Sequence, residues 1–183
     1  MNVPNKLTVL RVLMVPFFII AYEYGYFFTA FVLFIIASAT DFLDGYLARK
    51  NNIVTNFGKV MDPLADKILV YSALVLMVQD DTIYSIFLII ILMREFTIAG
   101  MRTVAAAEGI VIAAAWSGKL KTIFQMIAVF ILILSKGFIP DISYQIGEIL
   151  EKTGTVLFYI SMVLTVYSGF EYIYKNRNLF KKF

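Results

Sequence analysis

Two long stretches of this sequence, residues 24–40 and 153–170, contain no charged side chain. Shorter uncharged apolar runs occupy 68–79, 82–93 and 122–135. A helix needs about 20 mostly apolar residues to cross a bilayer, and the shorter runs reach that length only when charged residues at their ends are included. We therefore expect an all-α integral membrane protein with six transmembrane helices, at about 7–27, 28–50, 60–79, 83–106, 118–137 and 153–175.

The basic residues are distributed unevenly about these expected helices. An even number of spans puts both termini on one side, and that side receives all of the 16 Lys and Arg residues except Lys136 and Lys152. Because cytoplasmic loops carry the excess of Lys and Arg, we predict a multi-pass protein of the cell membrane with both termini in the cytoplasm. The other side collects acidic residues: Glu23, Asp80, Asp81, Asp141, Glu148 and Glu151.

No linker, repeat or low-complexity segment divides the chain, so we interpret residues 1–183 as a single transmembrane domain. A net charge of +3 could elsewhere indicate nucleic-acid binding. Here the basic residues stand at the ends of apolar segments, which favours membrane lipid as the partner and no nucleic acid.

Histidine and cysteine are both absent from the sequence. Their absence excludes disulfides, thiolate nucleophiles, zinc sites built from Cys and His, and every catalytic arrangement with a histidine base. Any chemistry must therefore rest on carboxylates, Lys, Arg, hydroxyl groups and hard cations.

Four aspartates gather at the expected cytoplasmic ends of the second and third helices. Asp41 and Asp44 are three residues apart, and Asp62 and Asp66 are four apart, so each pair shares one face of its helix. The short connection makes the two helices antiparallel neighbours and brings the pairs together. Pro63 is expected in the first turn of the third helix, where backbone N–H groups lack helical partners anyway.

Such a group of carboxylates requires neutralisation, because two like charges about 5 Å apart repel by roughly 3 kcal/mol at an effective dielectric near 20. All-oxygen ligands favour Mg²⁺ or Mn²⁺ over zinc, and two such ions would form a clamp for phosphoryl transfer. A plainer interpretation is a set of helix-end carboxylates facing water, with Asp62 as a helix cap. It is less favoured because Asp41 and Asp44 stand at a helix C-terminus, where the helix dipole disfavours anions.

Written with its spacing, the segment 41–66 reads D-x-x-D-G-x-x-A-R-x8-G-x3-D-x3-D, which resembles the signature of the CDP-alcohol phosphotransferase family at every defining position. The chain length, the six expected spans and the N-terminal residues Asn5, Thr8 and Arg11 are similar to those of bacterial members that use glycerol 3-phosphate. The resemblance implies that Asp66 is the general base and that two Mg²⁺ or Mn²⁺ ions are bound by Asp41, Asp44, Asp62 and Asp66.

The resemblance also implies a reaction and its substrates. The expected enzyme carries out a metal-dependent transfer of a phosphatidyl group from CDP-diacylglycerol to sn-glycerol 3-phosphate, giving phosphatidylglycerol phosphate and CMP. A homodimer is a further implication. Contacts to the nucleotide are expected from Asn5, Thr8, Asp44, Gly45, Ala48, Arg49 and Gly58.

Basic residues of the fourth and fifth helices are candidates for binding the acceptor's phosphate. Arg94 stands too deep in an apolar helix for easy access to the membrane surface, which favours a polar cavity. A pocket of cations suits a phosphorylated acceptor better than inositol, serine or choline. The candidates are Arg94, Arg102, Lys119 and Lys121. A plainer interpretation pairs Arg94 with Glu95 or an aspartate and makes the other three anchors at the cytoplasmic membrane surface.

Two other functions stay open at this point. The same transfer could use another acceptor, such as inositol phosphate, serine or a phospholipid. A cation channel or transporter, with the aspartates as ion ligands, is disfavoured because the acids gather at one membrane face, whereas transport sites usually lie near the midplane between repeats.

Overall fold

Helices account for nearly all of the computed structural model, which describes residues 3–50, 56–113, 115–141 and 143–177. Side chains at 3–4, 41–50, 56–57, 59–60 and 138–141 lie outside the description. No strand occurs within the described ranges, so the expected all-α class is confirmed for them. The helices are α1 (Val3–Glu23), α2 (Phe27–Lys50), α3 (Asn56–Gln79), α4 (Ser85–Ala107), α5 (Trp116–Asp141) and α6 (Tyr144–Lys175).

Three helices begin clearly earlier than expected, because polar and charged residues can continue a helix beyond its apolar run: α1 at Val3, α3 at Asn56 and α6 at Tyr144. α6 begins at Tyr144, well before residue 153, and its first turns carry an ion pair between Lys152 Nζ and Glu148 Oε1 at 2.6 Å. Such a pair one turn apart stabilises a helix whose charges face water. A prediction based on uncharged stretches therefore places the start of this helix too late, because the helix continues beyond the apolar region.

The expected place of Pro63 is wrong because α3 also begins earlier than expected. α3 begins at Asn56, so Pro63 lies inside the helix and not in its first turn. Proline has no N–H to donate to the carbonyl four residues earlier, so the backbone ladder of α3 lacks the bond from residue 63 to residue 59, in the turn that leads to Asp62 and Asp66. Asp62, the seventh residue of the helix, is likewise not a helix cap.

Within the described residues, three helices are long and apolar enough to cross a membrane, over Asn5–Glu23, Trp116–Gly137 and Tyr144–Lys175. A shorter apolar segment, Phe27–Thr40, begins α2. Several apolar helices of this kind are typical of a multi-pass membrane protein.

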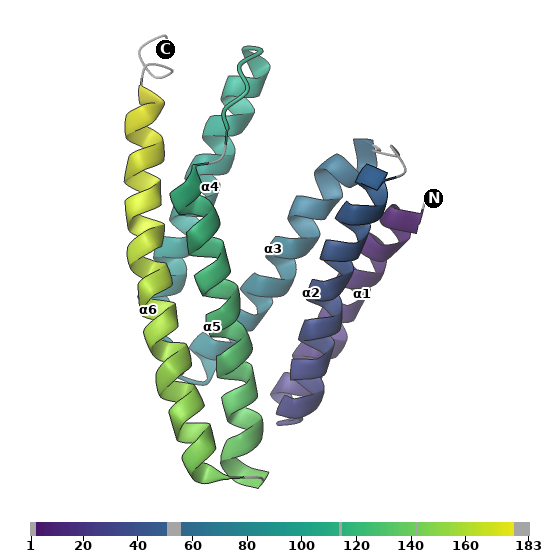
Figure 1. The fold of residues 1–183 in the computed structure, drawn as a ribbon, viewed down its shortest axis with the longest axis vertical. Coiled ribbons are helices and arrows are strands. Elements are labelled where there is room, and N and C mark those ends of the chain that lie inside the picture. Colours follow the sequence, from purple (N-terminus) through teal and green to yellow (C-terminus); the bar gives the residue numbers. More distant parts are fainter. Residues whose placement is uncertain (1–2, 51–55, 114, 142, 178–183) are drawn as a thin grey trace.

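The helices form two groups, which Figure 1 shows diverging toward one end of the molecule. In the first group α1 packs on α2 and α3, and in the second α6 packs on α4 and α5. Contacts of α2 and α3 with α5 join the groups. We call the end where α1 starts and α6 ends the terminal end, and the opposite one the distal end (Figure 1).

Aromatic packing fills the junction between the two groups. The buried rings of Phe18 and Phe34 lie 5.5 Å apart, and Phe34 meets Phe130 of α5 edge-on at 5.0 Å. Within the second group, Gly154 lets α6 approach α5 so closely that an added Cβ would lie 2.8 Å from Leu132. The junction is therefore a packed core, against which polar side chains at either end can be held.

At the distal end a carboxylate ties both groups together. Asp80, in the turn after α3, accepts hydrogen bonds from Tyr22 Oη at 2.5 Å and Thr82 Oγ1 at 2.5 Å. Lys136 Nζ of α5 lies 2.9 Å from the same carboxylate. Partial burial works to raise the pKa of Asp80, but these donors outweigh it and hold the pKa below its ordinary value. We call Tyr22, Asp80, Thr82 and Lys136 the distal network.

Candidate active site

The aspartate pattern lies on two neighbouring helices at the terminal end. α2 contains residues 41–49 of the pattern and α3 contains residues 58–66, and the two helices contact each other, as the sequence predicts. The side chains of α2 in this pattern lie outside the description, and their expected roles remain predictions: Asp41, Asp44, Gly45, Ala48 and Arg49.

α1 supplies polar partners for both described aspartates. Thr8 Oγ1 donates a hydrogen bond of 2.6 Å to Asp62 Oδ1. Arg11 Nη1 donates one of 2.5 Å to Asp66 Oδ1, and Arg11 Nε reaches Thr40 Oγ1 of α2 at 3.4 Å. The two carboxylates, one turn apart on α3, are thus both oriented by one face of α1.

Arg11 is the residue of this site to which the sequence analysis gave no role. Its side chain is fully buried, and a buried guanidinium requires a partner that carries the opposite charge. The signal in the sequence is the three-residue spacing of Asn5, Thr8 and Arg11, which places them on one helix face. Asn5 and Gly58, two expected nucleotide contacts, are also buried at this end.

The donor set present fits a hard divalent cation. Asp62 and Asp66 offer carboxylate oxygens one helical turn apart, which suits Mg²⁺ or Mn²⁺. Among the residues whose side chains are described, no three carboxylates come close enough to hold an ion, since Asp41 and Asp44 fall outside that set. The two-ion site therefore remains a prediction.

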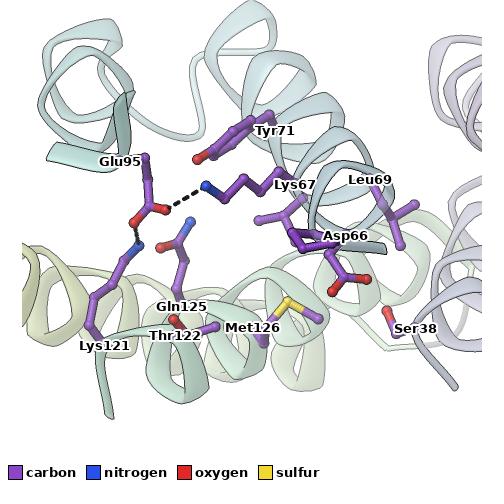
Figure 2. Close-up of a pocket in the computed structure, with 12 residues that line it drawn as sticks. Ser38, Asp66, Lys67, Leu69, Tyr71, Glu95, Lys121, Thr122, Gln125 and Met126 are labelled. Carbon is purple, nitrogen blue, oxygen red and sulfur yellow. Dashed lines mark hydrogen bonds and ion pairs between the residues drawn. The ribbon is translucent and has the colours of Figure 1, made fainter. Parts of the chain in front are cut away.

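A cavity of about 350 Å³ opens beside Asp66, between α3, α4 and α5. Figure 2 shows Asp66 and Ser38 on one side of it and Glu95 on the other. Two polar atoms on its walls, Ser38 Oγ and Gln125 Oε1, are buried and have no hydrogen-bond partner in the described part of the chain. Because buried polar atoms rarely go without a partner, this cavity is suited to a small hydroxylated molecule.

Three cations surround Glu95 at the edge of the cavity. Lys121 Nζ lies 2.7 Å from its carboxylate, Arg94 Nη1 lies 2.8 Å away and Lys67 Nζ 3.4 Å away. Arg94 and Lys121 were expected at the acceptor site, whereas Lys67 and Glu95 were not. With Glu95 ionised, the four groups leave an excess of two positive charges, which suits an anion.

The other two expected acceptor residues lie elsewhere. Arg102 donates from Nε to Tyr172 Oη at 3.1 Å, and its guanidinium lies 5.5 Å from the centre of that ring. Lys119 is exposed, with its ammonium 5.7 Å from the ring centre of Trp116. Neither lines the cavity beside Asp66, and Arg94 does not line it either but contacts Glu95 at its edge.

Comparison with known proteins decides the family. The sequence model described as CDP-alcohol phosphatidyltransferase matches residues 1–167. The chain belongs to this family. The matched range includes α1 and the segment 41–66 on α2 and α3.

Individual members of the family resemble the chain over nearly its whole length. A Bacillus subtilis (strain 168) protein named CDP-diacylglycerol–glycerol-3-phosphate 3-phosphatidyltransferase is 40% identical, over 96% of this chain and 95% of its own. Proteins of the same name from Rickettsia felis and Haemophilus influenzae are each 38% identical, over 93% and 94% of this chain and 93% and 91% of their own.

Proposed function

We propose that this protein transfers the phosphatidyl group of CDP-diacylglycerol to sn-glycerol 3-phosphate, releasing phosphatidylglycerol phosphate and CMP. The observation that carries the proposal is the position of Asp66, which belongs to the family signature and lines a cavity with Lys67 and Lys121. Relatives that are named for this reaction and match almost the full chain support it.

In the proposed reaction an acceptor hydroxyl attacks the phosphatidyl phosphorus. A new P–O bond forms to glycerol 3-phosphate, and the bond to the CMP oxygen breaks. The hydroxyl is a weak nucleophile until a base removes its proton. We assign that role to Asp66, because Glu95, which also lines the cavity, is paired with three cations. Arg11 holds Asp66 in place through the bond between Nη1 and Oδ1.

The cavity would bind the acceptor through both of its chemical parts. Lys121 and Lys67 would bind the phosphate, with Arg94 adding positive charge behind them. Ser38 Oγ and Gln125 Oε1 would bond the hydroxyl groups, since both lack another partner among the described residues. Arg102 and Lys119, further from the cavity, would at most attract the anion from outside.

The nucleotide and the metal ions would occupy the α1, α2 and α3 side of Asp66. When bound there, two Mg²⁺ or Mn²⁺ ions would neutralise the diphosphate and stabilise CMP as a leaving group. We assign the ions to Asp41, Asp44, Asp62 and Asp66. We assign the nucleotide to Asn5, Thr8, Asp44, Gly45, Ala48, Arg49 and Gly58.

We further propose that all six helices cross the cell membrane, as one domain over residues 1–183, with both termini in the cytoplasm. α3 and α4 would span despite their charges, because Asp66, Lys67 and Glu95 face the cavity and not lipid. The active site would then lie at the cytoplasmic boundary, where acyl chains stay in lipid while the head group reacts. The proposed assembly is a homodimer.

The test is a panel of acceptors with the purified protein. We expect CMP release from CDP-diacylglycerol and Mg²⁺ with sn-glycerol 3-phosphate, and none above background with glycerol, serine or inositol. Glycerol is the matched control, because it differs from the proposed acceptor by the phosphate alone. Equal rates with glycerol would contradict the phosphate pocket, and no release with any alcohol would contradict the enzyme itself.

A further inference from the structure

Glu95 joins three helices at the cavity. Its own helix, α4, supplies Arg94, while the ammonium groups of Lys67 and Lys121 come from α3 and α5. In Figure 2 the Glu95 carboxylate lies between the two lysine side chains, with an interaction to each. One carboxylate therefore sets the positions of two cations that belong to opposite walls.

Lys121 depends on this carboxylate more than Lys67 does. Only 4% of Lys121 is exposed, and a buried ammonium is costly unless an anion is paired with it. Glu95 is the carboxylate that pairs with both lysines among the described residues, and each lysine keeps further N–H donors for a ligand. Without Glu95, three cations would remain together and would repel one another.

The Arg94 side chain, which contacts Glu95, packs closely against two glycines. A Cβ added to Gly118 of α5 would lie 3.1 Å from Arg94 Nη2, and one added to Gly169 of α6 would lie 3.2 Å from Arg94 Cγ. Both distances are shorter than ordinary van der Waals contact between such atoms. On the far side, Nη2 donates to Ser168 Oγ at 3.0 Å, so the guanidinium is held on several sides.

We propose that Glu95 is a positioning residue, which holds Lys67 and Lys121 in the geometry that binds the acceptor's phosphate, and that Gly118 and Gly169 serve the same end by admitting Arg94 to Glu95. The proposal rests on the proposed function, because it concerns the acceptor pocket. Glu95 itself, an anion, repels the phosphate and acts through the lysines. Its charge leaves the cluster with two positive charges, which matches a phosphate dianion.

The first test replaces Glu95 by glutamine, which keeps the size of the side chain and removes the charge. We expect Glu95→Gln to raise the KM for glycerol 3-phosphate by about tenfold or more, with the KM for CDP-diacylglycerol changed less than about twofold. Binding is read separately, as the rise in unfolding temperature that glycerol 3-phosphate produces without CDP-diacylglycerol. That rise should shrink in the variant.

The glycines provide a milder test with a matched control. Gly118→Ala and Gly169→Ala should each raise the KM for glycerol 3-phosphate by about three- to tenfold, because the Arg94 side chain has to shift by a few tenths of an ångström and its contact with Glu95 changes. Gly100→Ala on α4 makes the same chemical change at a helical glycine with nothing within 4 Å of the added Cβ. It should leave both KM values unchanged, and it corrects for the gain in helix propensity.

The outcomes separate the two proposals. An unchanged or lower KM for glycerol 3-phosphate in Glu95→Gln would overturn the positioning role, and so would equal effects of Gly118→Ala and Gly100→Ala. If Glu95→Gln does not fold, the two glycine variants decide. If the wild-type protein neither binds nor consumes glycerol 3-phosphate, the proposed function is wrong and the role of Glu95 in it is wrong as well.

Discussion

The two ends of the junction between the helix groups use similar side chains, but they differ in the size of the cavity beside those side chains and in the balance of charge. At the distal end, Asp80 brings Tyr22 of α1 and Lys136 of α5 together, and the cavity beside them measures only about 160 Å³. At the terminal end, Glu95 also gathers lysines from different helices, yet a cavity of about 350 Å³ remains beside it.

Charge balance distinguishes the two ends. In the distal network one carboxylate meets one ammonium, and hydroxyl groups of Tyr22 and Thr82 fill the remaining positions on Asp80. Around Glu95 three cations share one carboxylate. A neutral, fully bonded cluster stabilises a fold, whereas a surplus of buried charge beside a cavity indicates a ligand of the opposite sign.

The largest expected contrast comes from making one change at both ends. Asp66→Asn removes the proposed base and should lower kcat by about 100- to 10,000-fold while CDP still binds, because the side-chain shape is kept. Asp80→Asn should leave kcat within about twofold. CMP release at saturating substrates and calorimetric CDP binding measure the two effects. Normal turnover by Asp66→Asn would remove Asp66 as the base.

A second contrast uses three lysines of α5. Lys121→Met should raise the KM for glycerol 3-phosphate about 10- to 100-fold, because a buried cation facing the phosphate is lost. Lys136→Met, at the distal end, should leave that KM unchanged and lower the unfolding temperature instead. Lys119→Met tests the expectation from the sequence: a KM effect equal to that of Lys121→Met would move the phosphate site toward the surface.

A pH series sharpens the contrast further. The donors around Asp80 hold its pKa below the ordinary value, so its ionised form stabilises the fold. That stabilisation is complete above the ordinary pKa of an aspartate and is lost as the pH falls through the lower pKa of the folded protein. Asp80→Asn should therefore cost about 1–3 kcal/mol at neutral pH. The difference in unfolding temperature from wild type should shrink below about pH 4, and a constant difference would contradict this account.

The smallest expected effect is that of Tyr22→Phe, which removes the hydroxyl donor to Asp80 and nothing else. We expect a loss of about 1 kcal/mol, or roughly 2–4 °C in unfolding temperature, with unchanged kinetics. Thermal unfolding and a CMP-release assay on the same sample check both parts. A change in KM for either substrate would show that the distal network communicates with the cavity.

The sequence predicts the helices and the signature well because both depend on local spacing. Uncharged runs locate the membrane helices, and intervals of three and four residues put Asp62 and Asp66 on one face of α3. The errors also have a local cause: α6 and α3 both begin in polar sequence before their apolar runs, so the expected starts were too late and Pro63 was expected too near the start of α3.

Tertiary contacts explain what the sequence could not supply. Arg11 and Lys119 are both basic residues near helix ends, yet one is buried against Asp66 and the other is exposed beside Trp116. Glu95 stands next to Arg94 in the sequence, and the ion pair between them, the plainer interpretation of Arg94, is present in the structure. Its contacts to Lys67 and Lys121 come from helices that only the fold brings together.

The walls of the cavity belong to different helix groups, since Lys67 lies on α3 and Lys121 on α5. An acceptor phosphate bound to both would act as a removable cross-link between the two halves of the protein. While it is bound, the two helix groups would move less relative to each other at the terminal end. Release of the product would restore that motion in each turnover.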